Sequence, residues 1–209
     1  QATHAELRAY VQCIRDLLAT GAGTWQAKPA KLTWWRGKVP IYIAASGPRT
    51  LRLAGEIADG VVINTGLLPE IIQDSIAQVR AGAERAGRSL EEIDMWWLPL
   101  TNLAADRATA IDEIGMSLAS AGSHLTYFTT AGKHIPPEMM AKVTALGERY
   151  RHDQHDKPEG PNRRLIFELG LADYLADRYA IAGTPADCVK KIERAVDAGA
   201  RSGEAQVHA

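Results

Sequence analysis

The sequence has few cysteines, no excess of either charge and no long hydrophobic run, and each absence excludes a class of protein. Among its 209 residues are only two cysteines, Cys13 and Cys188, both in helical patterns. We therefore expect two reduced thiols in a cytoplasmic protein. The 24 Lys and Arg residues nearly balance the 25 Asp and Glu residues. The charge therefore gives no reason to expect nucleic acid or an anionic membrane as a partner.

The chain also lacks the segments that mark membrane and secreted proteins. No apolar run approaches the ~20 residues that a membrane-spanning helix needs, and residues 1–15 form an amphipathic pattern rather than a signal peptide. Neither GxGxxG nor the glycine-rich loop of P-loop NTPases is present, so those nucleotide-binding folds have no support. Because the first residue is Gln1 rather than Met, we expect an expression product, a processed chain or a fragment.

Predicted strands and helices alternate along the first half of the chain, which indicates an α/β protein with a parallel sheet. Strands are predicted over residues 40–46, 60–64 and 93–101, and helices over 4–19, 48–58 and 68–87. The first of these strands has apolar residues without alternation, so we expect it to be buried on both faces. The second half is mostly helical, with helices predicted over 105–121, 137–151, 161–176 and 184–198 and a short strand over 124–130.

The clearest chemical signal follows the first strand, where the chain reads Ser46-Gly47-Pro48-Arg49. Pro48 suits the first turn of a helix, and Gly47 before it lets a ligand approach the backbone closely. Arg49 could add a formal positive charge. Three free backbone N–H groups are expected to form an anion site at this helix start, those of Arg49, Thr50 and Leu51.

A second small, polar loop, Asn64-Thr65-Gly66, follows the next strand. In a parallel sheet the carboxyl ends of neighbouring strands lie side by side, so both loops are predicted to hold one phosphate group. Between the loops, Ala54 and Gly55 are expected to let the helix pack tightly on the sheet. The alternative is that both loops are only the turns that any βαβ unit requires.

Other polar residues carry weaker signals. Thr101 and Asn102 could line the pocket, although turn and cap residues of the same types are common. His152 and His155 are three residues apart, but a solvated loop is the better interpretation and no metal site is expected. The sequence assigns no acid or base, and it does not favour His124 in that role.

The stretch PIYIAASGPRTLRLAGEIADGVVINTG resembles the luciferase-like flavin oxidoreductase superfamily, and in particular the branch that uses the deazaflavin coenzyme F-420. That branch includes methylenetetrahydromethanopterin reductase and deazaflavin-dependent glucose-6-phosphate dehydrogenases. ELRAYVQCIRDLLATG resembles the helix before this block, and GLADYLADRYAIAGTPADCVKKIERAVDAGAR resembles the C-terminal segment of the family. The resemblance covers nearly all of residues 5–201.

The resemblance implies a TIM-like (β/α) barrel with its site at the C-terminal mouth. It implies an oxidoreductase that transfers a hydride between F-420 and a small organic substrate. The alternatives are an FMN-dependent monooxygenase of the same superfamily and a non-catalytic flavin-binding protein or fragment. The family's phosphate-binding positions correspond to Ser46, Gly47, Pro48, Asn64, Thr65 and Gly66, and catalytic residues remain unassigned.

Three departures from the family pattern bear on these expectations. Some deazaflavin members carry a Lys where this chain has Leu67, so a cationic clamp must come from elsewhere, such as Arg49. We expect residues 1–209 to form only the C-terminal part of one barrel domain, because family members have front strands before this point. The last residues, RSGEAQVHA, do not resemble the family's hydrophobic final strand. Such a chain would expose apolar surface and sheet edges, and the resemblance also allows a homodimer.

Overall fold

The computed structural model describes residues 3–34, 37–201 and 206–207, and the chain divides into two compact units. The first unit consists of Gln1–Val62 and Ala77–Met95, and the second of Ile63–Ile76 and Trp96–Ala209. Within the described residues, no helix combines the length and the apolar character needed to cross a membrane. Cys13 and Cys188 are both buried and free, which confirms the prediction of unpaired thiols.

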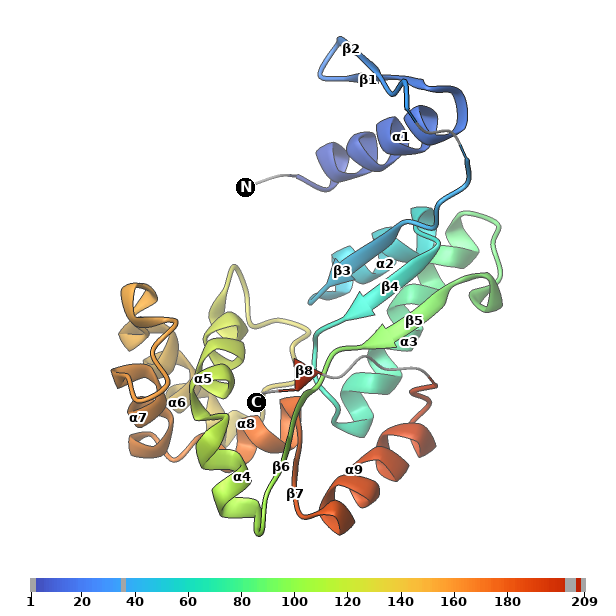
Figure 1. The fold of residues 1–209 in the computed structure, drawn as a ribbon. Coiled ribbons are helices and arrows are strands. Elements are labelled where there is room, and N and C mark those ends of the chain that lie inside the picture. The colour runs from blue at the N-terminus through green and yellow to red at the C-terminus, as the bar shows by residue number, and fades with distance from the viewer. Residues whose placement is uncertain (1–2, 35–36, 202–205, 208–209) are drawn as a thin grey trace. The chain divides into compact units, whose positions relative to one another are not determined.

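The first unit contains a long helix, a hairpin and a sheet of order β3-β4-β5 with helices between its strands (Figure 1). Three elements, β4, α3 and β5, each begin in one unit and end in the other. In chain order the elements are α1 (His4–Thr20), β1 (Ala22–Trp25), β2 (Lys28–Lys31), β3 (Tyr42–Ala45), α2 (Pro48–Ile57), β4 (Gly60–Ile63), α3 (Pro69–Arg85), the 3-10 helix η1 (Leu90–Glu92) and β5 (Asp94–Trp97). The antiparallel hairpin of β1 and β2 was not predicted from the sequence.

Strand β3 is covered on one face only, so the prediction that it is buried on both faces is wrong. Ile43 and Ala45 are buried, whereas Tyr42 and Ala44 are exposed. The strand lies at the edge of its sheet, and helix α2 packs against it. Apolar residues on both faces allow a strand to be buried on both faces. Whether each face is buried depends on the elements that pack against it.

Two glycines allow helices α2 and α3 to pack at very short distance. A β-carbon built on Gly55 would lie 2.1 Å from the carbonyl oxygen of Val79, and one on Gly82 would lie 1.9 Å from that of Arg52. Gly55 was expected to bring the helix close to the sheet. The structure corrects this, because the backbone that its missing side chain admits belongs to α3.

The second unit is built around a three-stranded sheet of order β7-β6-β8, in which both strand pairs are parallel. Helices α4 to α8 lie on one side of β6 and β7, and α9 lies on the other (Figure 1). The elements are β6 (Leu100–Leu103), α4 (Arg107–Glu113), α5 (Gly115–Ser123), η2 (His124–Thr126), α6 (Pro137–Arg149), η3 (His152–Gln154), α7 (Pro161–Glu168), α8 (Ala172–Tyr179), β7 (Ala180–Gly183), α9 (Pro185–Asp197) and β8 (Gln206–Val207).

Several predicted elements of this unit differ from the observed ones. The predicted strand over 93–101 divides at Leu98-Pro99 into β5 and β6, because proline cannot donate a ladder hydrogen bond. The predicted helix over 161–176 is divided into α7 and α8. The division lies at Gly170, whose φ of +61° ends the first helix. The strand predicted over 124–130 is wrong, since η2 begins there. Strand β7 and the short β8 were not predicted.

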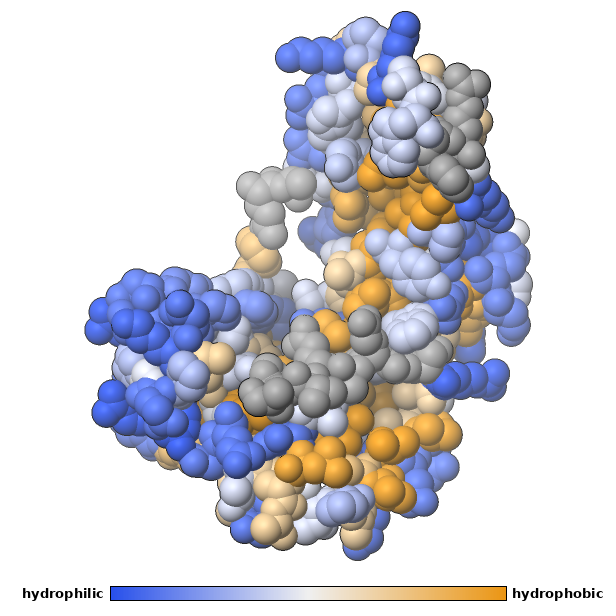
Figure 2. All heavy atoms as spheres, viewed as in Figure 1, coloured by the Kyte–Doolittle hydropathy of each residue, from blue (hydrophilic) through white to orange (hydrophobic). Residues whose placement is uncertain are grey.

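Helix α9 has the cap that the Gly-Thr-Pro sequence indicates, and its outer face is apolar. Thr184 and Asp187 form a reciprocal capping box, with Pro at the first helical position. Val189, Ile192 and Val196 are 53%, 46% and 55% exposed, and Figure 2 shows hydrophobic atoms over this helix. The prediction of exposed apolar surface is therefore confirmed on α9.

Candidate functional site

The first predicted loop lies at the start of α2, in the first unit. Gly47 is the N-cap in extended conformation, with φ −156° and ψ 158°, and Pro48 occupies the first helical turn as predicted. The N–H of Leu51 donates to the carbonyl of Gly47 at 3.0 Å, so the prediction that it is free is wrong. The N–H groups of Arg49 and Thr50 have no acceptor within the described part of the chain.

This helix start is open to a ligand. A β-carbon built on Gly47 would meet no heavy atom within 4 Å. Ser46 and Arg49 are exposed, and Arg49 forms no ion pair with the described residues. Helix N-termini attract anions through their unpaired N–H groups and dipole. The geometry of the loop therefore suits a phosphate group.

The second predicted loop, Asn64-Thr65-Gly66, belongs to the second unit and is fixed by contacts with Ser75 and Arg178. The Thr65 hydroxyl lies 2.9 Å from the hydroxyl of the buried Ser75. Gly66 has φ of +122°, and a β-carbon there would lie 2.7 Å from Cγ of Arg178. Gly66 is therefore required twice, for its backbone conformation and for the close approach of Arg178.

Arg178 is the residue that fixes this loop, and its side chain is almost fully buried, with 1% of the residue exposed. Its carbonyl accepts the N–H of Leu67 at 2.6 Å. Its guanidinium has no carboxylate partner in the described part of the chain and bonds only neutral oxygens. These are the carbonyls of Thr65 (3.1 Å), Lys133 (2.7 Å) and His134 (3.3 Å) and the hydroxyl of Tyr174 (3.1 Å).

A buried cation therefore lies directly beneath the predicted phosphate loop. Sequence reasoning sought a replacement for the missing lysine at Leu67 and named Arg49, which lies in the other unit. It missed Arg178, although an arginine just before the apolar run of β7 was a usable signal. That the two loops bind the same phosphate stays a prediction.

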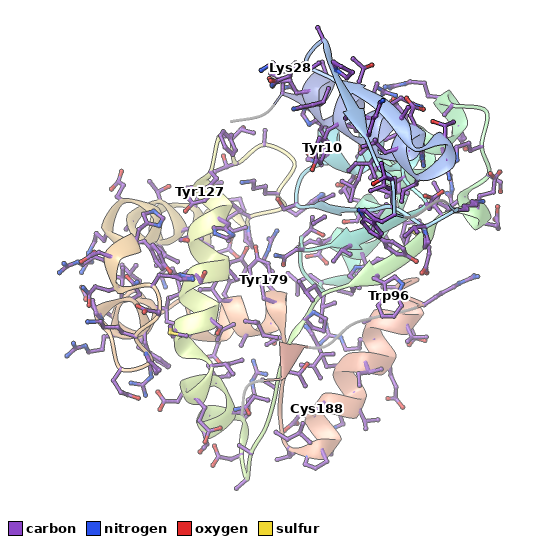
Figure 3. All side chains as sticks on the ribbon, turned by 45° about the horizontal axis from the view of Figure 1, so that its top comes forward. Tyr10, Lys28, Trp96, Tyr127, Tyr179 and Cys188 are labelled. Carbon is purple, nitrogen blue, oxygen red and sulfur yellow. The ribbon has the colours of Figure 1, made fainter. Side chains whose placement is uncertain are left out.

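A pocket of about 260 Å³ opens beside the second loop, entirely within the second unit. The apolar part of its wall consists of side chains of α5, β6 and the residues before β6. Figure 3 labels Tyr179, beside α5, and Tyr127, near the C-terminal end of that helix. The polar groups in the wall are an amide, two hydroxyls, two imidazoles and a phenol, those of Asn64, Ser117, Ser120, His124, His155 and Tyr179.

The imidazoles of this pocket are in an electropositive environment. Partial burial lowers the pKa of His124, and the nearby His155, Lys133 and His152 lower this pKa further. His155 Nδ1 lies 2.8 Å from the hydroxyl of Tyr150, a phenol whose own pKa is raised by burial. Burial likewise raises the pKa of Tyr179, so its phenol remains neutral and can donate.

The remaining candidates are placed as follows. His152 and His155 lie in an exposed segment as predicted, and the described residues contain no group of three potential metal ligands. The prediction nevertheless missed that His155 lines the pocket. Thr101 and Asn102 lie on β6 and do not line this pocket. Asn102 instead donates to the carbonyl of Ala110 at 3.1 Å, which ties β6 to α4.

Comparison with known proteins identifies relatives along most of the chain. Residues 1–202 match the family described as luciferase-like monooxygenase. The chain is 31% identical over 170 residues to 5,10-methylenetetrahydromethanopterin reductase of Methanolobus tindarius, covering 81% of this chain and 48% of that protein. It is 32% identical over 164 residues to an F-420-dependent glucose-6-phosphate dehydrogenase of Nakamurella multipartita, covering 78% and 40%.

The fold has matching solved structures. The structure of coenzyme F-420-dependent tetrahydromethanopterin reductase from Methanopyrus kandleri matches 96% of this chain and 56% of its own, with a TM-score of 0.66 and 25% identity. An F-420-dependent secondary alcohol dehydrogenase matches with a TM-score of 0.67 at 15% identity, covering 98% of this chain and 56% of its own. The predicted α/β fold of the luciferase-like barrel type is thereby confirmed. The chain spans about half the length of the curated relatives it matches, and it belongs to the luciferase-like monooxygenase family.

Proposed function

We propose that this chain is part of an oxidoreductase that transfers a hydride between coenzyme F-420 and a small organic substrate. The N. multipartita relative and the M. kandleri structure are both named as F-420-dependent enzymes. In this proposal residues 1–209 form the C-terminal part of a single barrel domain. The protein is cytoplasmic, acts on a small molecule and is able to form a homodimer.

The observation that carries the proposal is the open start of α2. Gly47 leaves space for a ligand, Pro48 starts the helix, and the N–H groups of Arg49 and Thr50 are unpaired within the described residues. Ser46, Gly47, Pro48 and Arg49 would hold the cofactor phosphate there. Asn64, Thr65 and Gly66 form the second phosphate loop of the proposal, with the charge of Arg178 beneath it.

The loops also fit the group chemically. Gly47, an extended glycine with free space around it, is a position where the backbone can approach a ligand closely. When bound, the deazaflavin supplies the hydride-transfer chemistry, while the protein binds it, orients it and excludes water. In the proposal, the residues of this chain bind the cofactor. None of them is assigned as the acid or base.

The proposal is tested by substituting Gly47 with aspartate and with asparagine. Both side chains are good N-caps, so we expect Gly47→Asp and Gly47→Asn to leave the free energy of unfolding unchanged or to raise it by up to ~1 kcal/mol. The carboxylate competes for the same N–H groups and repels phosphate. We therefore expect Gly47→Asp to weaken F-420 binding by at least about tenfold, ~1.4 kcal/mol, and Gly47→Asn to weaken it less.

Equilibrium titration with F-420 and with FMN, followed by fluorescence, measures both effects. Preference for F-420 together with the aspartate effect supports the proposal. Tighter binding of FMN replaces it with a flavin monooxygenase. If the unsubstituted protein binds neither cofactor, the two loops are ordinary turns, and binding without any turnover of reduced cofactor indicates a non-catalytic flavin-binding protein.

A further inference from the structure

The wall of the pocket beside Asn64 contains polar side chains but no acidic one. Its polar lining consists of amide, hydroxyl, imidazole and phenol groups. The acids nearest in sequence to His155 are Asp153 and Asp156, and neither lines the pocket. Asp153 is already engaged, since it pairs with Arg151 at 2.9 Å. A negatively charged ligand group would therefore meet no carboxylate in this wall.

The same pocket is surrounded by groups that are positive or become positive on protonation. His124 and His155 form part of the wall, while Lys133 and His152 lie close enough to lower the pKa of His124. Uncompensated positive groups of this kind repel one another, and an anion between them removes that repulsion. Burial raises the pKa of the phenols of Tyr150 and Tyr179, so both are neutral donors at ordinary pH.

Lys133 places a positive charge against the turn that carries His124. His124 directly follows the C-terminal end of α5, where unpaired carbonyls give a partial negative charge. The ammonium of Lys133 donates to three carbonyls of the turn that follows this helix end, those of His124 (2.9 Å), Leu125 (3.1 Å) and Tyr127 (2.9 Å). A positive charge therefore lies next to the negative end of the helix and weakens the repulsion that this end would exert on an anion near His124.

We propose that this pocket binds an anionic group of the substrate, a carboxylate or a phosphate, between the imidazoles of His124 and His155. Asn64, Ser117 and Ser120 provide further hydrogen bonds from other parts of the wall. A volume of about 260 Å³ exceeds that of a bare anion, so the anion is one end of an organic molecule. The inference rests on the proposed function, because only an enzyme has a substrate. It deepens that function by assigning the substrate a negative charge.

Sulfate is a suitable probe, because its charge does not change between about pH 5 and pH 8, where histidines titrate. Imidazolium binds the anion better than imidazole does, so sulfate affinity should rise as the pH falls. Because the pKa of His124 is below its usual value of about 6.5, the rise should continue below that pH. Calorimetric titration should show His124→Gln and His155→Gln each weakening sulfate binding by about tenfold (~1.4 kcal/mol) near pH 5.5.

The matched control is His152→Gln, which removes an imidazole from the same cluster but not from the pocket wall. We expect this variant to change sulfate affinity by less than about threefold (~0.6 kcal/mol). An equal loss in all three variants would mean diffuse electrostatics and would overturn the proposal, as would a pH-independent affinity or no saturable binding. Parallel titrations with methyl phosphate and acetate distinguish a phosphate-bearing from a carboxylate-bearing substrate.

Titration of the same variants with F-420 separates the two proposals. We expect His124→Gln and His155→Gln to leave F-420 affinity unchanged. If they weaken F-420 as much as sulfate, the pocket is part of the cofactor site and the inference of a substrate site fails. If the unsubstituted protein binds sulfate as expected but binds no F-420, the proposed function fails while the anion pocket remains.

Discussion

Replacing Arg178 with methionine is expected to lower the free energy of unfolding by about 3–5 kcal/mol. The substitution leaves the carbonyls of Thr65, Lys133 and His134 without the donor that now satisfies them. Each buried carbonyl without a partner costs about 1–3 kcal/mol, partly offset because methionine needs no desolvation of a charge. Urea denaturation followed by circular dichroism measures the change.

Arg178→Lys separates stability from loop geometry. Lysine keeps the charge but not the planar fork that reaches several carbonyls at once. We expect a smaller loss of stability, about 1–3 kcal/mol, with F-420 binding weakened at temperatures where the variant is folded. Arg164→Met is the control, because Arg164 is exposed on α7. Equal stability of Arg178→Met and Arg164→Met would contradict the role assigned to Arg178.

Gly55→Ala should lower the free energy of unfolding by about 3 kcal/mol, at the upper end of the usual cost of overpacking. The new methyl group would lie 2.1 Å from the carbonyl oxygen of Val79, so α2 and α3 must separate. Separation would also disturb the hydrogen bond from Arg52 Nε to Gln78 Oε1, now 2.6 Å. The better helix propensity of alanine offsets less than ~1 kcal/mol of this loss of stability.

Gly47→Ala is the control for this substitution, since its methyl group would meet nothing within 4 Å. We expect a loss of at most about 1 kcal/mol from the poorer N-cap. The comparison uses denaturation midpoints and slopes of the two variants measured together. If Gly55→Ala is no less stable than Gly47→Ala, the close helix contact is not a constraint on the folded state.

The sequence by itself determined the local features of the site. Gly47-Pro48 marked the start of α2 and Gly-Thr-Pro marked the start of α9. The strand predicted over 60–64 is observed as β4, Gly60–Ile63. These signals are local, because caps, prolines and apolar runs act on neighbouring residues. The family resemblance rested on the same block of residues.

Only the tertiary structure decided which distant groups support those local features. Arg178 lies 113 positions from Thr65 in the chain, and His124 and His155 come from separate segments that meet in one pocket. The exposed face of β3 likewise depends on its partners. Such contacts depend on how helices and strands pack, and residue spacing along a chain does not encode packing partners. The sequence therefore predicted two loops as candidate phosphate sites, whereas the structure revealed the buried cation and the imidazole pocket beside one of these loops.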